Sequence, residues 1–105
     1  MKRSIALIGI GLVALAVAAC TSISSQENFK QIIGASVGKS MSAPARVTNA
    51  YPEDLVSSRT LANGNIENEY RYQGACLYFY EFDPATTVIV RWRFEGPQSD
   101  CRINP

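Results

Sequence analysis

The residues best suited to chemistry are four carboxylates in the second half of the chain. Glu67 and Glu69 stand two residues apart in an alternating polar and apolar stretch, and Glu81 and Asp83 follow in the next such stretch. Side chains two apart on a strand lie on the same face of a sheet. Two carboxylates on one face are the pair that hydrolyses glycosidic bonds, one as acid and the other as base or nucleophile.

The same face is expected to carry Arg71, Arg91 and Arg93. Cross-strand ion pairs between these arginines and the acidic side chains account for the charges without any reaction. The chain also contains no histidine, which is the commonest general base and the commonest metal ligand. We therefore expect a ladder of salt bridges, no catalytic residue, no metal and no cofactor.

Four strands are predicted to position these side chains. Alternation and turn residues place them at 56–61, 66–72, 76–82 and 87–95. Before them, Ser24 and Glu27 have the spacing of a capping box, and apolar residues from Phe29 to Val37 follow helical spacing. We expect one amphipathic helix over 25–37 that stops at Gly38. The segment 40–54, between and around two prolines, predicts a single helical turn at most.

These elements predict an α+β fold, with a short N-terminal helix region packed on a three- to four-stranded antiparallel sheet as a two-layer sandwich. The face toward the helix should carry the even-numbered apolar residues: Ile66, Tyr70, Tyr72, Tyr78, Tyr80, Phe82, Val88, Val90, Trp92 and Phe94. The other face combines charges with Leu77, Phe79 and Ile89. We expect these three, rimmed by Arg91 and Arg93, to form a contact patch for a partner. Cover by segment 40–54 is the alternative.

The N-terminal residues have the layout of an export signal. Lys2 and Arg3 precede an uncharged run of 16 residues that ends at Cys20, with two alanines directly before the cysteine. A membrane-spanning helix needs about 20 apolar residues, so the run is short for that role. A basic start, an apolar centre and small residues at the end are typical of a signal peptide. An uncleaved signal anchor with a buried cysteine is the alternative.

The residues Val17-Ala18-Ala19-Cys20 resemble the bacterial lipobox. The resemblance implies that Cys20 is acylated, becomes the new N-terminus and anchors the protein in a membrane. It divides the chain into a signal peptide (1–19), the lipidated cysteine with a tether (20–25) and a small α+β domain (26–105). In such lipoproteins an aspartate after the cysteine retains the protein in the inner membrane. The residue here is Thr21, which implies the periplasmic face of the outer membrane.

With Cys20 assigned to the anchor, Cys76 and Cys101 remain. An even pair in an exported chain predicts a disulfide. A bridge that closes a loop of this size stabilises a protein by about 3 kcal/mol in the chain-entropy model, which is a large share for one small domain. A redox pair is the alternative, but the C-x-x-C spacing of such pairs is absent.

Residues 29–95 resemble the small SmpA/OmlA (BamE-like) outer-membrane lipoproteins. The most specific stretch is LANGNIENEY at 61–70, which leads into CLYFYEFDPATTVIVRWRFEG. The resemblance implies helices packed on an antiparallel sheet and a role in outer-membrane protein assembly. The chain lacks the leucine-glycine-proline turn that precedes the first strand in that family.

The charge balance narrows the class of partner. The formal net charge is +1, and it falls to −1 without Lys2 and Arg3, so there is no basic surplus of the kind that binds nucleic acid. We expect a non-catalytic binding or scaffolding lipoprotein of the outer membrane with a protein partner in the envelope. The alternative is an inhibitor or lectin-like module that binds a periplasmic hydrolase or a cell-wall glycan.

Overall fold

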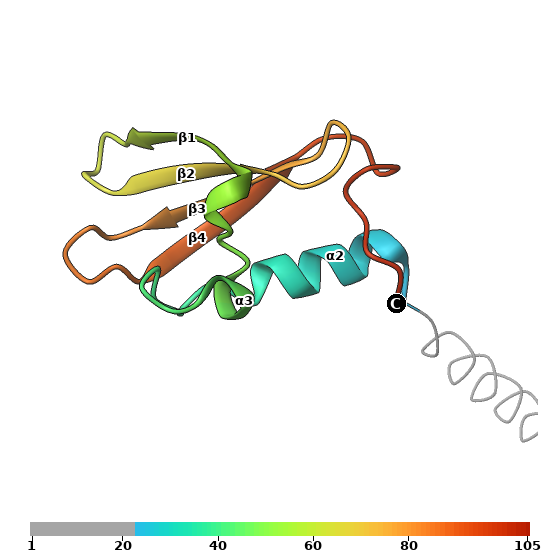
Figure 1. Ribbon diagram of the computed structural model, residues 1–105, viewed down its shortest axis with the longest axis horizontal. Helices are drawn as coiled ribbons and strands as arrows, with labels where there is room; N and C mark the ends of the chain where they lie inside the picture. The colour runs from blue at the N-terminus through green and yellow to red at the C-terminus, as the bar shows by residue number, and fades with distance from the viewer. Residues whose placement is uncertain (1–22) are drawn as a thin grey trace, which may run out of the picture.

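The structure is a computed structural model of the chain and describes residues 23–105. The predicted signal peptide (1–19) and the predicted lipidation site Cys20 lie outside the described residues. Figure 1 shows an α+β fold, in which helices precede one antiparallel sheet. The elements are α2 (Ser25–Gly34), α3 (Ala45–Thr48), the 3-10 turn η1 (Pro52–Asp54), β1 (Leu55–Thr60), β2 (Ile66–Arg71), β3 (Leu77–Phe82) and β4 (Ile89–Glu95). None of the helices within 23–105 has the length and apolar character needed to cross a membrane.

The sheet is a four-stranded meander. The strands lie in the order β1-β2-β3-β4, and each is antiparallel to the next. Short turns between consecutive strands leave no room for a crossover, so neighbours in the sequence become neighbours in the sheet. The four predicted strands are confirmed, with boundaries that differ by two residues at most.

Helix α2 begins where the sequence predicts and ends earlier. The Ser24 hydroxyl accepts a hydrogen bond from the Glu27 N–H at 3.0 Å, which confirms the predicted cap. The prediction that the helix continues to residue 37 is wrong, because the helix ends at Gly34. Beyond it Ser36 is buried, and its hydroxyl donates to the Thr48 carbonyl. The chain thus turns toward α3, which is the helical turn expected between the two prolines. The segment 40–54 also contains η1, so it has two helical turns instead of the one expected.

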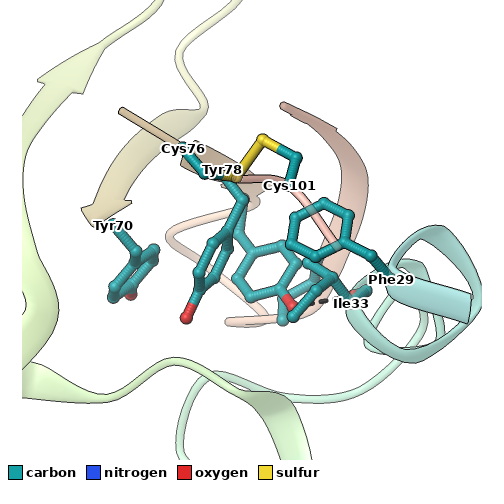
Figure 2. Packing of buried hydrophobic residues seen from close by; sticks show 8 residues of the cluster. Phe29, Ile33, Tyr70, Cys76, Tyr78 and Cys101 are labelled. Carbon is teal, nitrogen blue, oxygen red and sulfur yellow. Dashed lines mark hydrogen bonds between the residues drawn. A yellow bond between two sulfur atoms is a disulfide. The ribbon is translucent and has the colours of Figure 1, made fainter. Parts of the chain in front are cut away.

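The core lies between α2 and the sheet. Figure 2 shows Phe29 and Ile33 pointing from the helix toward the tyrosines of the sheet. The Tyr80 hydroxyl donates to the Ile33 carbonyl at 2.7 Å, and the rings of Tyr70 and Tyr78 stack with centroids 5.3 Å apart. Each buried hydroxyl oxygen has a partner, which removes the penalty of burying a polar group. The predicted tyrosine face is therefore confirmed as the core face.

The prediction that Ile89 lies on the exposed face is wrong. The register of β3 and β4 shifts by one residue between the pairs Glu81–Arg91 and Phe82–Ile89, so β4 carries a bulge. A shift of one residue moves a side chain to the other face of a sheet. Ile89 is consequently fully buried in the core, whereas Val90, predicted inside, is 40% exposed.

A short segment covers the outer edge of β4 at its beginning. Ile89 donates its N–H to the Lys39 carbonyl at 2.9 Å, and its carbonyl accepts from the Gly38 N–H at 2.7 Å. Met41 donates to the Thr87 carbonyl at 2.8 Å, and Ser40 bridges to Val88. These bonds explain the bulge. The N–H and C=O of Ile89 point away from β3 and pair with residues 38–39, which lie far away in the sequence.

The predicted disulfide between Cys76 and Cys101 is confirmed, with the two Cα atoms 5.2 Å apart. It links the residue before β3 to the C-terminal tail. Gly96 permits the approach, because a Cβ there would lie 2.9 Å from the Cys76 Cα and 3.1 Å from the Cys101 sulfur, and its φ is +134°. The tail then returns to the start of α2 (Figure 1), where Ile103 donates to the Ser25 carbonyl at 3.0 Å.

Candidate contact surface

The charged side chains gather on the sheet face opposite α2, which is called the outer face below. The register places Arg59, Glu67, Glu81 and Arg91 in one row across all four strands. The two glutamates stand directly opposite each other in the middle of the row, with an arginine at each end. Opposite charges in neighbouring cross-strand positions attract, so the row is stable despite the like charges at its centre.

Glu67 is held by two arginines. Arg93 donates Nε to Oε2 at 3.1 Å and Nη2 to Oε1 at 2.9 Å, and Arg59 donates Nη2 to Oε1 at 2.8 Å. The Glu67 side chain is only 8% exposed. The hydrogen bonds from Arg93, and then those from Arg59, hold the pKa of this carboxyl below its ordinary value. The same contact raises the pKa of Arg93.

Glu81 is held mainly by amides. Its Oε2 accepts from Asn65 at 2.8 Å and from Asn63 at 3.2 Å, both in the β1–β2 turn, and its Oε1 accepts from Arg91 at 3.2 Å. These bonds, Asn65 first, lower the pKa of Glu81. The turn that joins β1 to β2 is thereby attached to the middle of the sheet.

The remaining charged residues are used differently from the prediction. Within the part of the chain that the structure describes, the Glu69 carboxylate accepts a hydrogen bond only from the Ser57 hydroxyl, at 3.2 Å. Asp83 accepts from the Ala85 N–H within its loop. Within residues 23–105, Arg71 makes no ion pair. The salt-bridge ladder is therefore confirmed for Glu67, Glu81, Arg91 and Arg93. Among the described residues it is absent at Glu69, Arg71 and Asp83.

Sequence reasoning missed Arg59. The sequence pattern could have indicated it. Arg59 lies in the first predicted strand and is odd-numbered, like the residues predicted on the charged face, and it stands across the 63–65 turn from Glu67. The register Arg59–Glu67 follows from the length of that turn.

The predicted contact patch is only partly brought together. Leu77, Phe79, Arg91 and Arg93 lie on the outer face, but Ile89 belongs to the core. Phe79 is 5% exposed, because the guanidinium carbon of Arg93 lies 3.7 Å from the centre of its ring. The patch is therefore charged at its surface, with its aromatic side chain beneath. A hollow of about 160 Å³ adjoins it, lined by Glu67, Glu81, Arg91, Trp92 and Arg93.

The geometry limits the chemistry of this surface. Glu67 and Glu81 both have lowered pKa values, so both are ionised at neutral pH. A glycosidase needs one carboxyl whose pKa is raised so that it donates a proton. Within the described residues, no three acidic, cysteine or histidine side chains come together as a metal site. The arrangement of this pair suits a rigid charged binding surface rather than acid–base catalysis.

Comparisons with known proteins do not assign this surface to a class. No protein-family model matches the chain, and neither the curated proteins nor the solved structures contain a significant match.

Proposed function

We propose that this protein is a lipoprotein anchored through Cys20 on the periplasmic face of the outer membrane, where it binds a protein partner and performs no catalysis. The observation that carries the proposal is the Cys76–Cys101 bridge. The remaining cysteine, Cys20, stands at the end of an apolar N-terminal segment. Disulfides form and persist in oxidising compartments, and the periplasm is one. An export signal that ends in an acylation site would bring the chain there.

The SmpA/OmlA resemblance suggests the type of partner. We interpret the fold as the two-layer sandwich of that family, since Phe29 and Ile33 of α2 pack on the tyrosines of the sheet. On this interpretation the partner is a component of envelope or outer-membrane protein assembly. Fold alone does not define a function, so the binding surface has to support the role.

The outer face offers a suitable binding surface. The Arg91 side chain is 68% exposed, while its bond to Glu81 restricts its orientation. Arg93 is held between Phe79 and Glu67. Arginine is enriched among the residues that dominate binding energies, and a side chain that is already ordered loses less entropy on binding. A partner with an acidic patch would meet both guanidinium groups.

The alternative of an inhibitor that binds a periplasmic hydrolase rests on the same two arginines. A lectin-like role has less support. Sugar-binding sites stack ligands on exposed aromatic rings, whereas Tyr70, Tyr78 and Tyr80 are buried and Tyr72 is only 37% exposed. The hollow of about 160 Å³ beside Arg93 is also smaller than the roughly 300–1,000 Å³ of ordinary ligand pockets.

The anchor is tested by Cys20→Ser in the full-length chain. The serine hydroxyl cannot form the thioether, so the unprocessed precursor should accumulate and labelled palmitate should not be incorporated. Wild-type protein should be labelled and should sediment with the outer membrane. Cleavage and labelling of the variant would refute the lipoprotein assignment.

The binding surface is tested by Arg91→Ala, with Arg46→Ala as the matched control. Both arginines are exposed, but Arg46 lies on α3, away from the outer face. After crosslinking in intact cells, the partner recovered with wild type should be lost with Arg91→Ala and kept with Arg46→Ala. Equal recovery with both variants would exclude the outer face as the binding surface.

A further inference from the structure

The first strand is an open edge of the sheet. All six residues of β1 (Leu55–Thr60) are exposed, and within residues 23–105 β1 is paired only with β2. The opposite edge of the sheet, formed by β4, is partly covered, because residues 38–41 pair with its beginning. An exposed edge strand presents unpaired N–H and C=O groups that can pair with another strand.

The sequence of β1 does little to prevent such pairing. The strand reads LVSSRT, with neither proline nor lysine, and the charge of Arg59 is balanced by Glu67. Leu55 and Val56 are apolar and more than two-fifths exposed. A register shift between Leu55 and Ser57 makes Val56 a bulged residue. The regular part of the edge is therefore the short stretch from Ser57 to Thr60.

We infer that β1 pairs antiparallel with β1 of a second copy of this chain, about a two-fold axis through Ser58. The pairing would join two four-stranded sheets into one continuous sheet. Because a two-fold axis makes the same surface meet itself, the edge has to be complementary to itself. The inference concerns residues 55–69 alone and does not depend on the lipid anchor.

The register follows from the side chains. Residues that meet across an antiparallel pair must point to the same face, so the axis has to pass through a residue of the regular stretch. An axis through Arg59 would place two like charges directly opposite each other, which is destabilising. An axis through Ser57 would place Ser58 of each copy opposite the bulged Val56 of the other. An axis through Thr60 would pair the strand with the residues of the β1–β2 turn. The axis through Ser58 keeps the like charges apart and pairs residues 57–59 of the two copies before the bulge is reached. It sets Ser57 opposite Arg59 of the second copy.

Charge complementarity favours this register. Ser57 lies beside Glu69 on the outer face, and its hydroxyl donates to the Glu69 carboxylate at 3.2 Å. Glu69 makes no ion pair within residues 23–105. The guanidinium of Arg59 in the second copy would stand next to it, and the two-fold axis would make this contact twice. The charged row on the outer face would thus continue across the two copies.

The register is tested by Ser58→Cys in the full-length chain, purified in detergent. Directly opposite residues of an antiparallel pair have Cα atoms about 4.5–5.5 Å apart, which is within the range of a disulfide. Copper phenanthroline as oxidant should convert Ser58→Cys to a covalent dimer. Ser57→Cys is the matched control and should stay monomeric on a denaturing gel, because its two copies would be too far apart. Both variants retain Cys20, so a bridge through Cys20 would appear in both.

A second measurement needs no engineered thiol. Wild type should have the mass of two chains by light scattering in detergent. Glu69→Arg should shift it to one chain, because the new arginine repels Arg59 of the second copy. Glu27→Arg makes the same change of charge on the exposed side of α2, away from β1, and should leave the mass unchanged. A single-chain mass for wild type would overturn the inference, and so would equal crosslinking of Ser58→Cys and Ser57→Cys. The edge of β1 would then be available to pair with a strand of another protein.

Discussion

The guanidinium carbon of Arg93 lies 3.7 Å from the centre of the Phe79 ring. From that position Arg93 reaches across β3 and binds both oxygens of Glu67 on β2. The contact covers an aromatic ring on the solvent side of the sheet and keeps a buried carboxylate ionised. It links β2, β3 and β4 through side chains alone, and Arg59 adds β1 to the same carboxylate.

Glu67→Gln should lower the free energy of unfolding by about 1.5–3 kcal/mol at neutral pH, the range for hydrogen bonds to charged groups. The folded-state pKa of Glu67 lies below its ordinary value of 4.5. Its stabilisation is therefore fully present above that value and is lost as the pH falls through the lowered pKa. The difference between wild type and variant should shrink in the same window.

Urea denaturation at neutral pH and at several pH values below 4.5 measures this difference. Glu53→Gln is the control, since Glu53 is exposed in η1 and should change little at any pH. A wild-type advantage that stays constant into strong acid would show that the Glu67 contacts do not depend on its charge.

Ile89→Ala and Val90→Ala should differ sharply in their effect on the free energy of unfolding. Ile89 is fully buried, so truncation should reduce the free energy of unfolding by about 2–5 kcal/mol. Val90 is 40% exposed on the bulge, and its truncation should change stability by less than about 0.5 kcal/mol. Thermal denaturation of both variants compares them directly. The reverse order of stability would mean that β4 has no bulge at this position.

Gly34→Ala should destabilise the protein even though alanine is the better helix former. Gly34 is the last residue of α2, so the substitution gains less than the roughly 1 kcal/mol of propensity expected inside a helix. However, the new Cβ would lie 2.7 Å from Nε1 and 2.9 Å from Cε2 of Trp92, and overpacking costs about 1–3 kcal/mol. Trp92 is the only tryptophan, so its fluorescence should report the displacement. Gln31→Ala, on the exposed side of α2, is the control; a gain in stability for Gly34→Ala would show that the indole moves freely.

Loss of the disulfide should lower stability by about 2–5 kcal/mol, as in other small exported domains. The double variant Cys76→Ser/Cys101→Ser should therefore melt well below wild type under oxidising conditions. A reductant should lower the melting temperature of wild type to that of the variant and leave the variant unaffected. Equal melting temperatures before reduction would show that the bridge adds nothing to the fold.

Local patterns in the sequence were sufficient for the outline of the fold. Alternation and turn residues predicted the four strands, and short turns then left the meander as the simplest connection. Ser24 and Glu27 predicted the start of α2, because a helix cap involves only neighbouring residues. Counting cysteines predicted the bridge between Cys76 and Cys101, which the tail could form because Gly96 admits a close approach.

Three local features were decided by the tertiary structure alone. Alternation predicted that Ile89 points outward, but hydrogen bonds from residues 38–39 create a bulge that turns it into the core. The end of α2 depends on the contact between Ser36 and Thr48, and the cover over Phe79 depends on an arginine from a neighbouring strand. Each of these features results from contacts between residues far apart in the chain. A periodic sequence pattern reflects only neighbouring residues, so it cannot predict such contacts.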